Sequence, residues 1–378
     1  MSPPKPIGVG IVGYGFSTRT FHLPFILPNP SYRLVAFVQR HDAAADSRTG
    51  KTAPHCTIDY PEARRYKGHE EFLADEEVEL VIIATGHSSH AELAIAALKA
   101  GKHVVVEKPF CCSSEEADQV IAEAKKSGKV LTVFQNRRYD SDFRTLQSLV
   151  NQNAFGQITE AEIHYDVDFP PWASGNPGPD FKPGGGLMFG IGCHVLDQAL
   201  ALFGQPASVT GFYRSLVHPS KSDNAFTIVL QYDPSGPQKD LLVTVKGSIV
   251  SNLVYPLKYF VRGFDGTFIK HGEDPQEPQI VAEGMASTDP KFGYEHPDTY
   301  GVLTTSKKAH DSQVEKKRKW VGTVPSLKGD YMGYYEDVAK AIRGEKELVV
   351  KPETSRDGIR IIELARESAD SGRTLPFA

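Results

Sequence analysis

Residues 7–20 read IGVGIVGYGFSTRT, and this stretch decides how the first half of the chain folds. Apolar residues at positions 7, 9, 11 and 12 predict a buried strand, which ends in a glycine turn before an amphipathic segment begins. The order strand, glycine turn, helix is typical of the start of a dinucleotide-binding βαβ unit. In such a unit Gly13 permits the tight turn, and Gly15 lets the main chain approach a pyrophosphate at the helix N-terminus.

Two glycine frames fit the G-x-G-x-x-G pattern in this stretch. The frame that begins at Gly8 and Gly10 lies inside the predicted strand, where main-chain N–H groups bond to neighbouring strands. The working frame therefore consists of Gly13, Gly15 and Thr18, and the turn also contains Phe16 and Ser17. Thr18 replaces the third glycine, which weakens the match, although a small β-branched side chain still allows a helix to pack near a sheet. An ordinary strand-turn-helix corner is the alternative.

Length and composition favour two domains with a large core, since the chain has 378 residues and 40% hydrophobic content. The net charge of −5 provides no basic field for nucleic acid, and the basic run at 316–319 is interpreted as a solvated loop. Four cysteines occur at spacings that suit neither a disulfide framework nor a zinc site, which points to a reducing compartment. No metal site is expected.

The N-terminal residues MSPPKP lack the apolar core of a signal peptide. The longest apolar runs, at 80–84 and 103–106, are too short to span a bilayer. The sequence therefore predicts a cytoplasmic protein whose partners include neither membrane nor nucleic acid.

The end of the second predicted strand, at 33–38, bears on the choice of cofactor. In this type of fold that strand end meets the adenosine ribose, and NAD sites place an Asp or Glu there. Arg40 occupies this region instead and could bind a 2′-phosphate. A surface arginine at a strand end is the alternative, but together with the glycine turn Arg40 favours NADP over NAD.

Polar residues follow each of the next three predicted strands, at 80–84, 103–106 and 129–134. Because the carboxyl ends of the strands line the ligand crevice of a doubly wound sheet, these residues are predicted to face the cofactor. They are Thr85, His87 and His90, then Glu107, Lys108 and Pro109, then Asn136 and Arg137. For the two histidines, hydrogen bonding at a helix cap is the alternative. The X-Pro bond, in cis or trans, fixes a turn that holds Lys108 at the crevice.

The second half changes to predicted strands at 160–168, 207–216, 224–232, 241–248, 258–262 and 267–269. Helices are predicted at about 191–204, 331–343 and 354–370, while 275–319 is expected to be a long excursion. The fold class is therefore α/β: an N-terminal Rossmann doubly wound parallel sheet, then an α+β domain with a large, mostly antiparallel open-faced sheet. The predicted domains are 1–136 for the dinucleotide and 137–378 for substrate and oligomerisation, with the C-terminal helix able to pack back on the first.

The open face of the second sheet predicts a homodimer or a higher homo-oligomer, since a large bare apolar face is best explained by self-association. The strands at 224–232 and 241–248 are the expected interface. Alternation alone leaves open which face carries Ile228, Leu230, Val243 and Val245.

Five segments together carry a family resemblance. They are, in order, GYGFS, VVVEKPF, QNRRYDSDF, GGGLMFGIGCHVLDQ and FIKHGEDPQE. In this combination the chain resembles the Gfo/Idh/MocA oxidoreductases nearly end to end, and the last segment resembles the subgroup that acts on scyllo-inositol and related polyols with NADP. The resemblance implies hydride transfer between nicotinamide and a carbinol carbon, with the nucleotide in the first domain and the substrate over the second sheet.

The resemblance also implies the roles of individual residues. Lys108 matches the catalytic lysine of the E-K-P motif, and His194 matches the acid/base histidine of the G-x-H motif. A charged lysine stabilises a developing alkoxide, and a histidine is suited to take the alcohol proton. Tyr165 and Trp172 are expected to contact the substrate, although loop packing explains them equally well.

One position departs from the family pattern, which commonly reads D-x-G-x-H. Gly190 replaces the aspartate, which would share a helix face with His194 and orient its ring. Asp197 could substitute but more often is a structural residue in this motif. Otherwise Lys108 and His194 act alone, or with a carboxylate of the neighbouring strand, Asp166 or Asp168.

Three functions are compatible with these features. The first is an NADP(H)-dependent oxidoreductase of a cyclic polyol, sugar or related small molecule. The second is a nucleotide-dependent sensor or transcriptional co-regulator, which has no need to retain Lys108 and His194. The third is a reductase of a dihydrodiol or diketone. Retention of the two residues favours an enzyme.

Overall fold

The structure, a computed structural model, describes residues 4–44, 54–173 and 175–377. The side chain of Trp172 lies outside this described part. The chain forms two compact units. The first contains residues up to 136 together with 278–292 and 331–356, and the second contains 137–277, 293–330 and 357–378.

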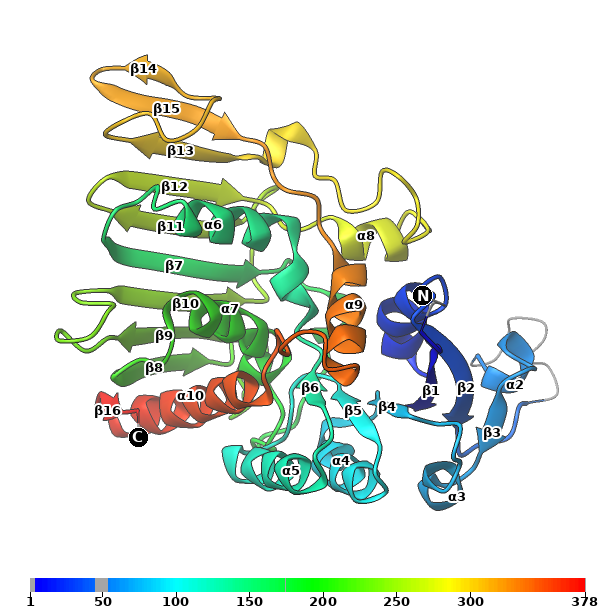
Figure 1. The fold of residues 1–378 in the computed structure, drawn as a ribbon. Coiled ribbons are helices and arrows are strands. Elements are labelled where there is room, and N and C mark those ends of the chain that lie inside the picture. The colour runs from blue at the N-terminus through cyan, green and yellow to red at the C-terminus, as the bar shows by residue number, and fades with distance from the viewer. Residues whose placement is uncertain (1–3, 45–53, 174, 378) are drawn as a thin grey trace. The chain divides into compact units, whose positions relative to one another are not determined.

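The first unit is built on a parallel sheet of six strands in the order β3-β2-β1-β4-β5-β6 (Figure 1). The strands are β1 (Ile7–Val12), β2 (Tyr32–Val38), β3 (Arg64–Tyr66), β4 (Leu80–Ile83), β5 (His103–Val106) and β6 (Leu131–Val133). The helical segments between them are η1 (Thr18–His22), α1 (Leu23–Ile26), α2 (Cys56–Asp59), α3 (His69–Leu73), η3 (His87–Ser89), α4 (His90–Lys99) and α5 (Ser114–Ser127). This order is the doubly wound Rossmann arrangement, as predicted.

The central strands are continuous apolar runs because both faces of the sheet are covered. Every residue of β1, β4 and the last three of β5 is buried. Gly8 and Gly10 lie within β1, where a Cβ atom would meet the carbonyl oxygen of Glu77 or the ring of Phe72. These glycines serve packing in the strand, so the glycine frame that begins at Gly13 is the one at the strand end.

Helix α9 (Tyr331–Ile342) brings a distant part of the chain into the first unit. Its three buried tyrosines face the sheet region: Tyr331 packs edge-on against Phe25 at 5.8 Å between ring centroids, and the Tyr334 hydroxyl donates to the carbonyl of Val133 at 3.0 Å. Tyr335 is fully buried. These contacts explain why 331–356 belongs to this unit.

The second unit is built on a ten-stranded, mostly antiparallel sheet in the order β14-β15-β13-β12-β11-β7-β10-β9-β8-β16. Only β7 and β10 pair in parallel among the described strand pairs of this sheet. The strands are β7 (Ile158–Asp166), β8 (Ser208–Arg214), β9 (Ala225–Gln231), β10 (Leu242–Ser248), β11 (Leu257–Gly263), β12 (Gly266–His271), β13 (Gly301–Thr305), β14 (Val314–Lys316), β15 (Lys319–Val324) and β16 (Leu375–Pro376).

Helices lie along one face of this sheet (Figure 1). They are α6 (Ser141–Asn151), α7 (Cys193–Phe203) and α10 (Pro352–Ser371), the last of which begins in the first unit. The covered face carries the aliphatic residues whose orientation alternation left open, Ile228, Leu230, Val243 and Val245, each with 0% exposure. They therefore form the core under the helices, so any partner must contact the other residues of β9 and β10.

The stretch at 275–319 is more regular than the sequence predicts. It contains α8 (Gln276–Val281), η7 (Pro297–Thr299), β13 and β14, so part of the expected long excursion is regular structure. The basic run 316–319 is also not a loop of its own: Lys316 pairs with Lys319, and Lys317 and Arg318 both have positive φ. Lys317 and Arg318 form the two-residue turn of a β-hairpin. The strands on either side of this turn are short and polar, so the sequence shows no apolar periodicity there.

Within the described residues, no helix combines the length and apolar character needed to cross a membrane.

Candidate functional site

The turn after β1 is shaped by Gly13 and Thr18. Gly13 has φ of 102°, and a Cβ atom there would lie 2.2 Å from the carbonyl oxygen of Ala84. The buried hydroxyl of Thr18 donates to the carbonyl of Gly13 at 3.0 Å, so the residue in the place of the third glycine closes the turn. A Cβ at Gly15 would meet nothing within 4 Å. The turn thus has the open main chain that a pyrophosphate requires, and it fits a dinucleotide.

Two more turn residues differ in their surroundings. Phe16 is 54% exposed and packs edge-on against Phe21, with 5.8 Å between ring centroids. The hydroxyl of Ser17 instead donates a short hydrogen bond to the carboxylate of Glu107. The glycine turn is therefore tied to the end of β5.

Arg65 of β3 and the following Lys67 bind the chain after β2, at residues 40–42. The Arg40 side chain is exposed, and its carbonyl accepts a hydrogen bond from Arg65. Asp42, two residues later, is bound by Arg65 at 2.6 Å and by Lys67 at 2.8 Å. Hydrogen bonds from Lys67 and Arg65 lower the pKa of Asp42 to about 2. The carboxylate two residues after Arg40 is thus already paired with two cations.

The residues after β4 divide into exposed and buried groups. Thr85 shares a hydrogen bond of 2.7 Å with Ser89, and His87 is exposed. His90 is fully buried, with Nδ1 2.9 Å from the carbonyl of Pro109 and Nε2 3.2 Å from that of Thr85. This geometry supports the structural alternative for His90, which links the ends of β4 and β5. Its predicted contact with a cofactor stays a prediction.

The Glu-Lys-Pro segment follows β5. Glu107 is buried, and its Oε2 accepts a 2.8 Å hydrogen bond from the main-chain N–H of Lys108. Lys108 is half-buried, and the Lys108–Pro109 peptide is cis. Asn136, at the start of η4 (Asn136–Tyr139) after β6, is also buried. The first unit therefore brings the glycine turn and this segment together.

Arg137 and Tyr165, two of the predicted site residues, lie against each other in the second unit. Arg137 is buried, and its guanidinium lies 2.6 Å from Glu277, 3.4 Å from Asp140 and 4.8 Å from the centre of the Tyr165 ring. Tyr165, on β7, is 7% exposed, and burial raises its pKa. Arg137 was predicted to bind cofactor, but the structure engages it with two acids and an aromatic ring of its own unit.

His194 lies in the first turn of α7 and is 5% exposed. The π-helical segment η6 (Met188–Gly192) precedes it, a feature common at functional sites. Asp197, one turn later, accepts two hydrogen bonds from Arg138, at 2.6 and 2.7 Å. This bidentate ion pair, 2% exposed at Asp197, supports the structural interpretation of that residue.

Asp166 and Asp168 are the carboxylates that were considered as partners of His194, and their surroundings differ. Asp166 lies 3.5 Å from Nδ1 of His164, which also contacts Glu162 at 2.9 Å. Asp166 directly follows the buried Tyr165 on β7, so the two side chains point to opposite faces of the sheet. Asp168 is exposed. At the position of the family aspartate, a Cβ on Gly190 would meet nothing within 4 Å.

Sequence reasoning missed a buried lysine beside Tyr165. Lys258 is 1% exposed at a register shift in β11, and its Nζ lies 4.4 Å from the centre of the Tyr165 ring. No hydrogen-bond acceptor reaches that Nζ in the part of the chain that the structure describes. Acids lie in the same interior: burial raises the pKa of Glu273, and burial with nearby Asp142 raises that of Asp274 to about 7. Both acids belong to the FIKHGEDPQE segment, and this segment is the one feature of the sequence from which they could have been predicted.

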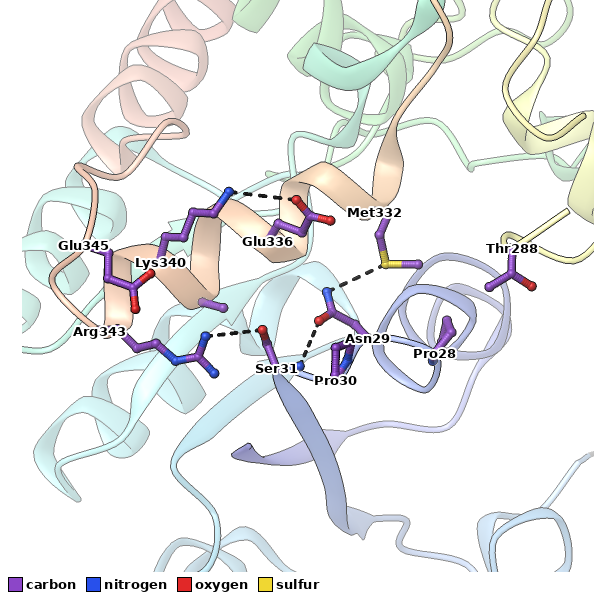
Figure 2. Close-up of a pocket in the computed structure, with 11 residues that line it drawn as sticks. Pro28, Asn29, Pro30, Ser31, Thr288, Met332, Glu336, Lys340, Arg343 and Glu345 are labelled. Atoms are coloured by element: carbon purple, nitrogen blue, oxygen red, sulfur yellow. Dashed lines mark hydrogen bonds and ion pairs between the residues drawn. The ribbon is translucent and has the colours of Figure 1, made fainter. Parts of the chain in front are cut away.

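A pocket of about 340 Å³ also occurs in the first unit (Figure 2). Its walls come from the chain before β2, from α9 and the residues just after it, and from Thr288. The lining residues are Pro28, Asn29, Pro30, Ser31, Thr288, Met332, Glu336, Ala339, Lys340, Arg343 and Glu345. Residues 28–31 lie at the amino end of β2, whereas the glycine turn, Arg40 and Lys108 follow the carboxyl ends of parallel strands. The pocket is therefore at the opposite edge of the sheet from the predicted cofactor residues.

Comparisons with known proteins cover both halves of the chain. Residues 7–135 match a family described as "Oxidoreductase family, NAD-binding Rossmann fold", and residues 143–269 match the "GFO/IDH/MocA C-terminal domain". An uncharacterized oxidoreductase of Schizosaccharomyces pombe is 34% identical over 99% of this chain and 99% of its own length. The NADP⁺-dependent scyllo-inositol 2-dehydrogenase of Bacillus subtilis is 32% identical over 98% of this chain and 95% of its own length.

A solved structure of an oxidoreductase from Bacillus subtilis has the same fold, with a TM-score of 0.84 and 32% sequence identity. The match covers 98% of each chain.

Proposed function

The chain belongs to the Gfo/Idh/MocA family of oxidoreductases, and from this premise we propose that it is an NADP(H)-dependent enzyme of small cyclic polyols, sugars or related carbonyl compounds. The proposed reaction transfers a hydride between the nicotinamide and a carbinol or carbonyl carbon. The similarity to an inositol dehydrogenase over almost the whole chain supports this substrate class.

One observation carries the proposal: the glycine turn and the Glu-Lys-Pro segment are joined through Glu107. Its carboxylate accepts from the hydroxyl of Ser17 in the turn and from the main-chain N–H of Lys108. A dinucleotide bound at the turn and the lysine that acts on the substrate must be held at fixed positions relative to each other, because reacting groups have to be positioned for the reaction. This carboxylate links them directly.

The proposed chemistry divides between two side chains. The bound nicotinamide supplies or accepts the hydride. Lys108 donates a hydrogen bond to the reacting oxygen, and its charge stabilises the negative charge that develops there. His194 takes the proton of the alcohol, or returns it in the reductive direction, which is a role suited to an imidazole.

The preference for NADP is tested by Arg40→Ala. A charge-assisted contact between Arg40 and a 2′-phosphate contributes about 1.5–3 kcal/mol, which corresponds to an approximately 10- to 150-fold preference. We expect the variant to bind NADPH more weakly by a factor in this range and NADH with unchanged affinity, in calorimetric titrations. Arg33→Ala is a matched control, because Arg33 is also exposed but lies at the start of β2 beside Glu77. Equal affinities of the wild type for both cofactors, or an unaltered NADPH affinity in Arg40→Ala, would contradict the assignment.

Self-association through the open face of the second sheet is also part of the proposal. This face presents exposed apolar side chains along several strands, among them Phe212, Leu242, Ile269 and Val302. We expect a dimer or larger species in sedimentation at micromolar concentration. Val229→Asp, in the middle of β9 on this face, is expected to shift the protein toward monomer, whereas Phe264→Asp between β11 and β12 is the control. A wild-type monomer would rule the interface out.

A further inference from the structure

A buried row of side chains lies behind the Glu-Lys-Pro segment of the first unit. The Tyr335 hydroxyl is 2.5 Å from Nδ1 of His22, and Nε2 of His22 is 3.1 Å from Oε1 of Glu107. The same Oε1 accepts from Ser17, while Oε2 accepts from the Lys108 N–H. His22 and Tyr335 are both 0% exposed. The proposed hydride transfer leaves these two residues without a role.

Aromatic rings surround the imidazole. His22 lies against Phe134, with 4.4 Å between ring centroids, and Tyr335 packs edge-on against Tyr32 at 5.7 Å and Tyr334 at 5.3 Å. Glu107 itself is 7% exposed, so its carboxylate has little access to water and depends on the donors aimed at it. His22 on η1 and Ser17 before it provide two side-chain donors, and the main chain of Lys108 provides the third.

The direction of the hydrogen bonds follows from the charge of Glu107. Burial by itself raises the pKa of this carboxyl. The hydrogen bond from His22, the positive charge of that ring when it is protonated, the nearby Lys108 and the bond from Ser17 together lower the pKa to about 2. The ionised carboxylate only accepts, so Nε2 of His22 carries a proton and donates it. In a neutral ring Nδ1 then accepts from Tyr335, whose hydroxyl stays protonated because burial raises its pKa.

We propose that His22, oriented by Tyr335, is a positioning residue that keeps Glu107 as a three-fold acceptor and so holds the glycine turn and the Lys108 main chain in register. A protonated Glu107 would carry an O–H donor and have less acceptor capacity left for Ser17 and the Lys108 main chain. The proposal rests on the proposed function only for its effect on turnover. The effect of His22 on the ionisation of Glu107 does not depend on the proposed function and is measured in the protein without cofactor.

The test compares His22→Phe with His22→Gln. Phenylalanine keeps the aromatic packing but removes the donor, so burial is expected to raise the pKa of Glu107. NADPH affinity should then acquire an acid limb that the wild type lacks. Turnover should lose a further factor of about ten per pH unit below the new pKa, in addition to the acid limb that His194 gives the wild type. Glutamine retains an N–H donor toward Glu107 and is expected to keep the wild-type pH profile. Adding Glu107→Gln to His22→Phe removes the titrating group and should abolish the limb.

Melting temperatures of the cofactor-free proteins supply an independent readout. A lowered carboxylate pKa adds stability above the unfolded value near 4.5, and this stability is lost as the pH falls toward 2. The difference in melting temperature between wild type and His22→Phe should therefore be largest above pH 5 and should shrink toward pH 3. If His22→Phe does not fold, Tyr335→Phe provides a milder change with the same expected pattern.

Two results would overturn the proposal. One is a melting difference for His22→Phe that is constant with pH, and the other is a loss in His22→Gln equal to that in His22→Phe. A wild type that turns over no polyol but shows the pH-dependent melting difference would contradict the proposed function and support the positioning role.

Discussion

Lys108→Met is expected to lower kcat by at least about 10²- to 10³-fold, because the variant lacks the donor and the charge placed on the reacting oxygen. Methionine keeps an unbranched side chain of similar length, and the main-chain N–H that binds Glu107 remains. NADPH affinity should therefore change little, which separates loss of chemistry from loss of cofactor. Steady-state kinetics with a responsive polyol, alongside calorimetric titration, measures both quantities.

Lys126→Met is the control for this experiment. Lys126 is an exposed lysine near the end of α5, where it lies 3.8 Å from Glu123, and its loss should leave kcat unchanged. A folded Lys108→Met protein with wild-type turnover would show that another group stabilises the developing charge.

Gly190→Asp is expected to move the pH optimum of turnover to higher values. It restores a carboxylate one helical turn before His194, and a nearby negative charge favours the protonated imidazole. The site has room, since a Cβ at Gly190 meets nothing within 4 Å and its φ is not positive. Asp197 does not supply this charge freely, because both of its oxygens bind Arg138. Activity measured across the pH range at saturating substrate tests the shift.

Gly190→Asn is the matched control, since asparagine has the same shape without the charge and should leave the optimum in place. Thermal denaturation of both variants verifies that they fold. Without the carboxylate, His194→Ala is expected to lose less than the roughly 10²- to 10⁴-fold of a dedicated general base. An unaltered pH profile in folded Gly190→Asp, together with a fully active His194→Ala, would show that His194 is structural.

Most of the parallel sheet could be predicted because its central strands are buried on both faces and appear as continuous apolar runs such as the one at 80–83. The edge strand β3 has no buried residue and therefore no such run. The hairpin of β14 and β15 could not be predicted either. Its strand β14 is exposed at all three residues and so has no apolar period, and its turn uses Lys317 and Arg318 at positive φ, where glycine or asparagine is the usual signal.

The candidate site was predictable where it depends on strand ends and not where it depends on distant contacts. Arg40 and Lys108 follow from their places after β2 and β5. The pairing of Asp42 with Arg65 and Lys67, by contrast, joins residues about one strand and loop apart. Likewise, His22 reaches Tyr335 across most of the chain, and no local pattern indicates that contact.

The most direct measurement is the near-ultraviolet absorbance of reduced nicotinamide while inositols, aldoses, keto-sugars and diones are offered with NADP⁺ and NADPH. The proposed function predicts a change in absorbance with at least one polyol or carbonyl compound. It also predicts faster turnover with NADP(H) than with NAD(H), and loss of the signal in Lys108→Met. Tight binding of NADPH with no turnover of any compound in the panel would contradict an enzyme and favour a nucleotide-dependent sensor.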